Sequence, residues 1–137
     1  MKYLIAGATL ALLTGCNGPS EEPLQSQPTA AAEDPQAQMA GLDQQIRSMI
    51  GMAYADNLEQ CRLAEVGHRP CGGPQYYIAY STTTVDEAVL QKLIAEHRQL
   101  QINYQQRHDV VGTCEVIPRP QLTMQGGRCI ASPTAER

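Results

Sequence analysis

Apolar residues recur every three or four positions in a segment that begins near residue 36. They are Met39, Leu42, Ile46, Met49, Ile50 and Ala53. This spacing places them on one face of a helix. The pattern predicts an amphipathic helix over residues 36–52 whose apolar face packs into a core. A continuation of this helix to Gln60 is less favoured, because Gly51 and Asn57 interrupt the pattern.

A second and longer periodic segment follows Thr84. The run Thr84-Val85-Asp86-Glu87 fits a capping box, with Thr84 at the N-cap and Glu87 at the third helical position. The apolar stripe that we assign to this helix is Val85, Val89, Leu93, Leu100 and Tyr104. The pattern predicts a helix that ends near Gln106. It also gives the acidic pair at the helix start a structural role, so we do not assign a catalytic carboxylate pair there.

Several short segments have the pattern of strands. Residues 61–66 alternate, and residues 76–80 are rich in tyrosine, which favours strands. Residues 110–117 also read as strand, and residues 121–131 read as a hairpin that turns at Gly126-Gly127. Two helices and a small antiparallel sheet of three to five strands predict an α+β fold. We expect one folded domain over residues 36–131 and a loose tail over 132–137.

The first 35 residues have no pattern of this kind. One lysine and the apolar block from Leu4 to Leu13 have the order of a signal peptide over residues 1–15. The block is too short to cross a bilayer, which takes roughly 20 apolar residues. Residues 16–35 are rich in Pro, Glu, Gln and Ser, with almost no apolar side chains to bury. We expect them to form a disordered tether.

The end of the predicted signal peptide carries a specific motif. Leu13-Thr14-Gly15-Cys16 resembles the lipobox of bacterial lipoprotein precursors. The resemblance implies that Cys16 receives a diacylglycerol and becomes the new N-terminus, and that palmitate or a similar acyl chain can follow. Two or three acyl chains anchor a protein stably to a membrane. The next residue is Asn17 and not Asp, which favours the outer membrane facing the periplasm.

Charge and cysteine content narrow the picture further. The chain has 10 Lys and Arg against 14 Asp and Glu, and loss of Lys2 with the signal peptide leaves a net charge of −5. Such a chain has no cluster of basic residues of the kind that binds nucleic acid. Beyond Cys16 there are four cysteines, Cys61, Cys71, Cys114 and Cys129. An even number in an exported chain predicts two disulfides rather than a metal site. Short loops favour the pairs Cys61–Cys71 and Cys114–Cys129, with cross-pairing of the two halves as the alternative.

Catalytic signatures are not apparent in the sequence. His97 and His108 have no second ligand at metal-binding spacing, and Ser81 is not part of a nucleophile elbow. No phosphate-binding or dinucleotide-binding glycine pattern occurs. We therefore predict no enzyme activity, no cofactor and no metal.

The densest group of recognition residues lies around the Pro70-Cys71-Gly72-Gly73-Pro74 turn. His68, Arg69, Gln75, Tyr76 and Tyr80 are the candidate binding residues. Tyr and Arg often anchor interfaces, and binding residues tend to lie on loops of a rigid scaffold. The alternative is that the turn is purely structural and the tyrosines fill a core without phenylalanine.

Residues 61–129 resemble a domain of small, poorly characterised bacterial lipoproteins. The resemblance rests on Cys61, Pro70-Cys71-Gly72-Gly73-Pro74, Tyr80-Ser81, Cys114 and Gly126-Gly127-Arg128-Cys129. It implies no activity. Together the observations predict a lipid-anchored periplasmic module that binds a protein partner in the cell envelope. The alternatives are an inhibitor or immunity protein against a cell-wall hydrolase, a small envelope enzyme that uses Ser81 or His68, and a structural lipoprotein.

Overall fold

The computed structural model describes residues 34–134. The predicted signal peptide, Cys16 and nearly all of the predicted tether lie outside these residues, as does the end of the tail. The described part confirms the α+β class, with two helices, four strands and one short 3-10 helix. In chain order, the elements are α1 (Pro35–Ile50), η1 (Leu58–Gln60), β1 (Cys61–Val66), β2 (Tyr76–Ser81), α2 (Glu87–Arg107), β3 (Gln121–Gln125) and β4 (Arg128–Ser132).

Helix α1 lies where the apolar periodicity predicts it. The Asp34 side chain caps its first turn by accepting a hydrogen bond from the Gln36 amide. Leu42, Ile46 and Ile50 are its buried residues. The helix ends at Gly51, whose positive φ of 55° suits glycine, so the helix does not continue to Gln60.

Helix α2 differs from the prediction at its start and on its buried face. Asp86, and not Thr84, is the N-cap, and its carboxylate accepts hydrogen bonds from the amides of Ala88 and Val89. The buried residues are Leu90, Ile94 and His97, whereas Val89 is 44% exposed. The buried face is therefore rotated by one residue from the predicted stripe. None of the helices in the described part is long and apolar enough to cross a membrane.

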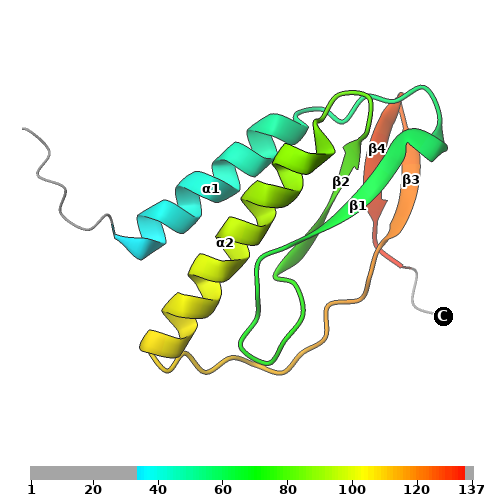
Figure 1. Ribbon diagram of the computed structural model, residues 1–137. Coiled ribbons are helices and arrows are strands. Elements are labelled where there is room, and N and C mark those ends of the chain that lie inside the picture. The colour runs from blue at the N-terminus through cyan, green and yellow to red at the C-terminus, as the bar shows by residue number, and fades with distance from the viewer. Residues whose placement is uncertain (1–33, 135–137) are drawn as a thin grey trace, which may run out of the picture. The chain divides into compact units, whose positions relative to one another are not determined.

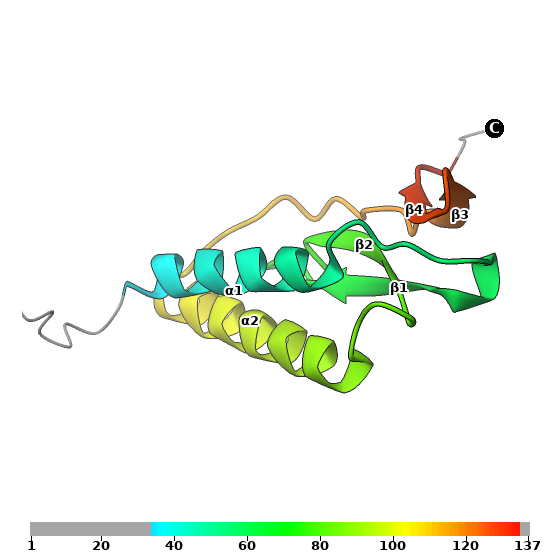
Figure 2. The same cartoon turned by 90° about the horizontal axis from the view of Figure 1, so that it is seen from above.

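The antiparallel strands β1 and β2 form a ribbon between two other layers (Figures 1 and 2). Ala64, Val66, Tyr76 and Tyr80 lie on the ribbon face that meets the helices, because side chains alternate along a strand. Cys61 and Glu65 point the other way, toward the β3–β4 side of the domain. The ribbon thus has helices on one face and the β3–β4 hairpin on the other.

The β3–β4 hairpin confirms its prediction, with Gly126 and Gly127 both at positive φ in the turn. The predicted strand over residues 110–117 is wrong, because residues 110–120 are neither helix nor strand. The single sheet of three to five strands is also wrong, since the four strands form two separate pairs. The Tyr54 backbone adds an isolated bridge to Arg128 of β4.

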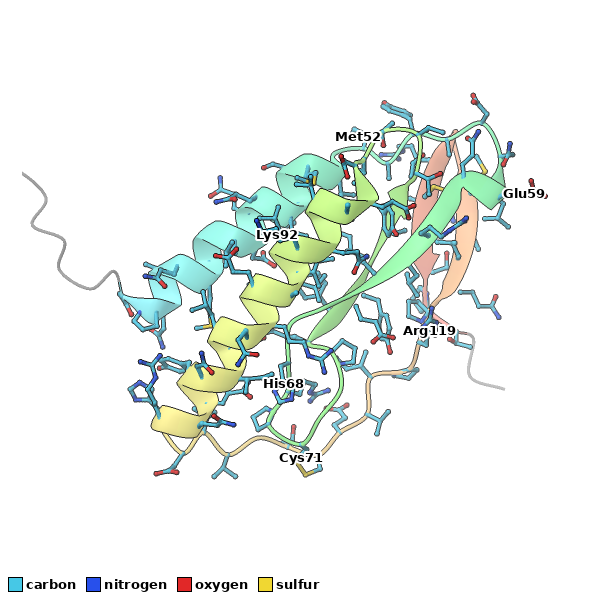
Figure 3. The ribbon with its side chains drawn as sticks, in the orientation of Figure 1. Met52, Glu59, His68, Cys71, Lys92 and Arg119 are labelled. Carbon is cyan, nitrogen blue, oxygen red and sulfur yellow. A yellow bond between two sulfur atoms is a disulfide. The ribbon has the colours of Figure 1, made fainter. Side chains whose placement is uncertain are left out.

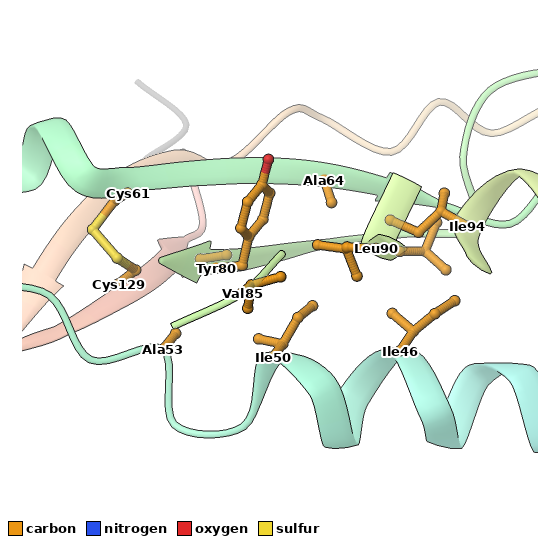
Figure 4. Close-up of a cluster of buried hydrophobic side chains, with 12 residues drawn as sticks. Ile46, Ile50, Ala53, Cys61, Ala64, Tyr80, Val85, Leu90, Ile94 and Cys129 are labelled. Carbon is orange, nitrogen blue, oxygen red and sulfur yellow. A yellow bond between two sulfur atoms is a disulfide. The ribbon is translucent and has the colours of Figure 1, made fainter. Parts of the chain in front are cut away.

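One apolar core joins both helices to the ribbon and the hairpin (Figure 4). Ile46, Val66 and Leu90 are fully buried in it. Tyr80 and Ser81 are also buried, at 4% and 0% exposed. Every layer therefore contributes side chains to the same core, as expected for a single small domain.

Both disulfides are present, but the favoured pairing is wrong. The bonds are Cys61–Cys129 and Cys71–Cys114, which is one form of the cross-pairing left open by the sequence. Cys61–Cys129 crosses between β1 and β4, whose backbones stack in adjacent layers (Figure 4). Loop-closure entropy favours short loops, but the packing of the hairpin on the ribbon brings distant cysteines together and decides the pairing.

Candidate functional site

Two irregular segments contribute walls to a recess outside the core. One is the loop of residues 67–75 between β1 and β2, and the other is residues 110–120, which we call the connector. The Cys71–Cys114 disulfide joins them at the end of the domain where α2 finishes (Figure 3). Long connections without secondary structure in compact domains are usually either functional loops or linkers.

The recess consists of two adjoining clefts, which together we call the groove. The first cleft, of about 550 Å³, lies between the loop, the end of α2 and the connector. The second, of about 990 Å³, lies between the start of β2, the connector and the end of β4. The two clefts share Gln75, Ile117 and Pro118 in their walls, so they adjoin one another at these residues.

His68 is held in the groove wall by two glutamines of α2. The Gln101 side-chain oxygen Oε1 accepts a hydrogen bond from the His68 backbone amide at 2.6 Å. Gln105 donates from Nε2 to the His68 carbonyl oxygen at 2.7 Å, and its Oε1 lies 2.9 Å from His68 Nδ1. Because that oxygen can only accept, the proton of the neutral ring resides on Nδ1. Nε2 is then left with a lone pair that can accept a hydrogen bond.

Arg69 and Gln75 complete the polar part of the groove. Arg69 is partly buried, and its guanidinium makes no hydrogen bond or ion pair with any residue in the described part of the chain. Gln75 Oε1 accepts from Gln101 at 2.9 Å. Gly67 is required here, because its φ is +79° and a Cβ atom would lie 2.7 Å from Gln101 Oε1. The three predicted residues His68, Arg69 and Gln75 therefore lie together in the groove.

The connector supplies an apolar wall that the sequence prediction missed. Val110, Val116, Ile117 and Pro118 line the first cleft, and Val116 is 84% exposed. Val111, next to the cleft, is 92% exposed. The sequence pattern predicted a strand here, and a paired strand would not expose these side chains to this extent. An alternative signal was present in Pro118 and Pro120, which restrict strand pairing.

Tyr80 is not the surface residue that the sequence predicted, whereas Tyr76 lines the second cleft of the groove. Tyr80 is 4% exposed and donates to the Glu87 carboxylate at 2.7 Å, so it belongs to the core. Tyr76 is half-buried and donates to the Asp43 carboxylate. The Arg47 guanidinium lies 4.5 Å from the centre of the Tyr76 ring and bonds the same carboxylate at 2.7 Å. Burial and the neighbouring carboxylate raise the pKa of both tyrosines.

His97 is a buried polar residue that the sequence analysis left without a role. It is 4% exposed, and Nδ1 has no hydrogen-bond partner among residues 34–134. Burial lowers the pKa of His97, and the nearby Asp43 carboxylate offsets only part of that effect. Burial raises the pKa of Asp43, but hydrogen bonds from Arg47 and Tyr76 outweigh it, so this pKa is lowered. The fold therefore favours a neutral His97 beside a charged Asp43.

This arrangement predicts that His97 destabilises the domain in mild acid. The folded-state pKa of His97 is below the ordinary value of 6.5. The stability that neutral His97 contributes is therefore fully present above pH 6.5. The contribution is lost as the pH falls through 6.5 toward the lowered pKa. We expect the midpoint temperature of thermal unfolding to decrease as the pH is lowered from about 8 to about 5.5. The decrease is expected to be smaller in His97→Leu. His108→Gln, at an exposed position of the same region, is the control; an unchanged pH slope in His97→Leu would contradict the assignment.

The site has the chemistry of recognition. It combines an apolar wall, a guanidinium without a partner and a fixed imidazole, which suit contact with another polypeptide. Among the described residues, no group of three or more His, Cys, Asp or Glu side chains is placed to hold a metal ion. No family model matches the chain, and neither curated proteins nor solved structures give a significant match.

Proposed function

We propose that this chain is a lipid-anchored module of the cell envelope that binds a protein partner in the groove. The lipobox at Leu13-Thr14-Gly15-Cys16 supports the anchor, and the residues between Cys16 and α1 supply a spacer. The groove supplies the contact surface. Its role is binding rather than catalysis, because recognition needs the free polar groups and apolar wall that this site contains.

The observation that carries the proposal is the exposure of apolar side chains on a segment that is held in place. Val111 and Val116 are almost fully exposed, yet the connector that carries them is tied to the loop by a disulfide. Exposed apolar residues that adjoin a polar rim mark interaction sites. A connector that is already ordered loses less conformational entropy when a partner binds, which favours affinity.

The test uses the full-length protein solubilised from native membranes. Wild type, Val116→Asp and Val89→Asp are each purified, and the co-purified proteins are quantified by mass spectrometry. Val89 is the matched control, since it is an exposed valine on α2 away from the groove. We expect a partner whose recovery falls at least about tenfold in Val116→Asp alone, equivalent to about 1.4 kcal/mol of binding free energy. Recovery that is equal in both variants would refute the groove as the contact surface.

A further inference from the structure

The two disulfides differ sharply in their access to solvent. Cys61 and Cys129 are 2% and 4% exposed, and both belong to the apolar core. Cys71 and Cys114 are both exposed at the edge of the domain (Figure 3). Thiol–disulfide exchange requires a thiolate to reach a sulfur atom, so accessible bonds exchange and buried bonds resist. Only one of the two bonds is therefore open to a thiol reagent in the folded protein.

The accessible bond is the covalent link between the two walls of the groove. Apart from the disulfide, the connector meets the loop where Gly112 packs against the Pro70 ring, which a Cβ atom on residue 112 would approach to 3.0 Å. The Gly112 carbonyl oxygen lies 3.8 Å from Cys71 Sγ. Within the described residues, no backbone hydrogen bond joins residues 67–75 to residues 110–120. Opening the bond would free the connector from the loop without disturbing the core.

We propose that Cys71–Cys114 is a thiol-exchange site that controls the groove, with a dithiol as its reductant. A thiolate of the dithiol attacks one sulfur, forms a mixed disulfide and releases the other cysteine as a thiolate. The second thiol of the reagent then displaces the remaining cysteine. Two electrons and two protons pass to Cys71 and Cys114, and the reagent leaves as a disulfide.

Neighbouring charges give the reaction a direction. Arg69 lies two residues before Cys71, whereas Glu115 directly follows Cys114. Positive charge favours a thiolate and negative charge disfavours it. Cys71 is therefore the better leaving group, and attack on the sulfur of Cys114 is the favoured first step. The free guanidinium of Arg69 thus has a role in the exchange as well as in the groove wall.

Exchange at this bond would change the shape of the binding surface. With the bond closed, Val116 and Ile117 face the same cleft as His68 and Arg69. With the bond open, the connector is free to leave the loop and the apolar wall is lost. The consequence for partner binding rests on the proposed function, whereas the exchange itself does not. An oxidised protein would bind the partner and a reduced one would release it.

The experiment treats the full-length protein with glutathione as the probe, quenches with acid and alkylates the free thiols for peptide mapping. We expect the Cys71–Cys114 bond to open at least about tenfold faster than the Cys61–Cys129 bond, with Cys71 appearing first as the free thiol. The glutathione adduct is expected mainly on Cys114. Equal rates for the two bonds, or earlier opening of the buried one, would overturn the site. An adduct mainly on Cys71 would overturn the direction of attack.

Two further measurements separate this proposal from the proposed function. Arg69→Gln is expected to slow the first step several-fold, while Arg98→Gln, at an exposed arginine of α2, leaves the rate unchanged. Amide hydrogen exchange over residues 110–117 is expected to speed up after reduction while that of α1 does not change. If reduction of the Cys71–Cys114 bond did not speed up amide hydrogen exchange in the connector, control of the groove by this bond would be overturned. Neither measurement needs the partner, so each stands if partner binding fails.

Discussion

Replacing both Cys61 and Cys129 with alanine is expected to lower the free energy of unfolding by about 3 to 4 kcal/mol. The bond joins residues 68 positions apart and crosses from β1 to β4 through the core. Loss of the bond increases the conformational entropy of the unfolded chain and leaves cavities among buried side chains at both positions. Because native proteins are stabilised by only about 5 to 15 kcal/mol, this loss removes a large fraction of the total stability.

Urea unfolding of the double variant measures this loss, and Cys71→Ala/Cys114→Ala is the matched control. The second bond closes a loop of comparable length, because its cysteines are 43 residues apart. Its removal also frees the connector in the folded state. The conformational entropy that the folded protein gains in this way offsets part of the entropy gained by the unfolded chain. We therefore expect the control to lose roughly half as much stability. A control that is less stable than the Cys61/Cys129 variant would contradict the larger contribution assigned to the buried bond.

Replacing Cys16 with alanine is expected to release nearly all of the protein from the membrane. The variant needs a cleavable signal peptide of a secreted protein in place of residues 1–15, since an uncleaved signal peptide would itself retain the chain. Without acyl chains no lipid anchor remains, and the sequence has no basic run to replace it. The measurements are membrane fractionation and labelling with a palmitate analogue.

Ser20→Ala in the native precursor is the control, and it is expected to remain membrane-bound and labelled. Persistent membrane association of the Cys16→Ala variant would contradict the anchor. Wild type that carries no acyl label would contradict it as well. Neither outcome would change the description of the fold and the groove, which rests on residues 34–134 alone.

The sequence predicted the secondary structure correctly where a single residue or residue pair determines the local backbone conformation. The Gly126-Gly127 pair fixes the hairpin turn, and Gly51 ends α1. The buried face of α2 was misassigned because His97 occupies a core position beside Leu90 and Ile94. A polar residue in a buried row breaks the apolar pattern, and Val89 then appears to be the better match.

Features that depend on packing between distant segments were not predictable from the sequence. The disulfide pairing follows from how the hairpin packs on the ribbon, which no spacing rule contains. His68 was a candidate because of its neighbours, but Gln101 and Gln105, which hold it, are 33 and 37 residues away. Their four-residue separation on one helix face was a usable signal only once the partner loop was known.

The most direct test of the groove is photo-crosslinking in living cells with the full-length protein. A photoreactive amino acid is placed singly at Arg69 and Val116, on opposite walls of the groove, and at Met52 and Val89, which are exposed apolar positions elsewhere. The account predicts that Arg69 and Val116 give one and the same adduct, and that Met52 and Val89 do not give it. An adduct that forms at Met52 or Val89 and at neither groove position would contradict the account.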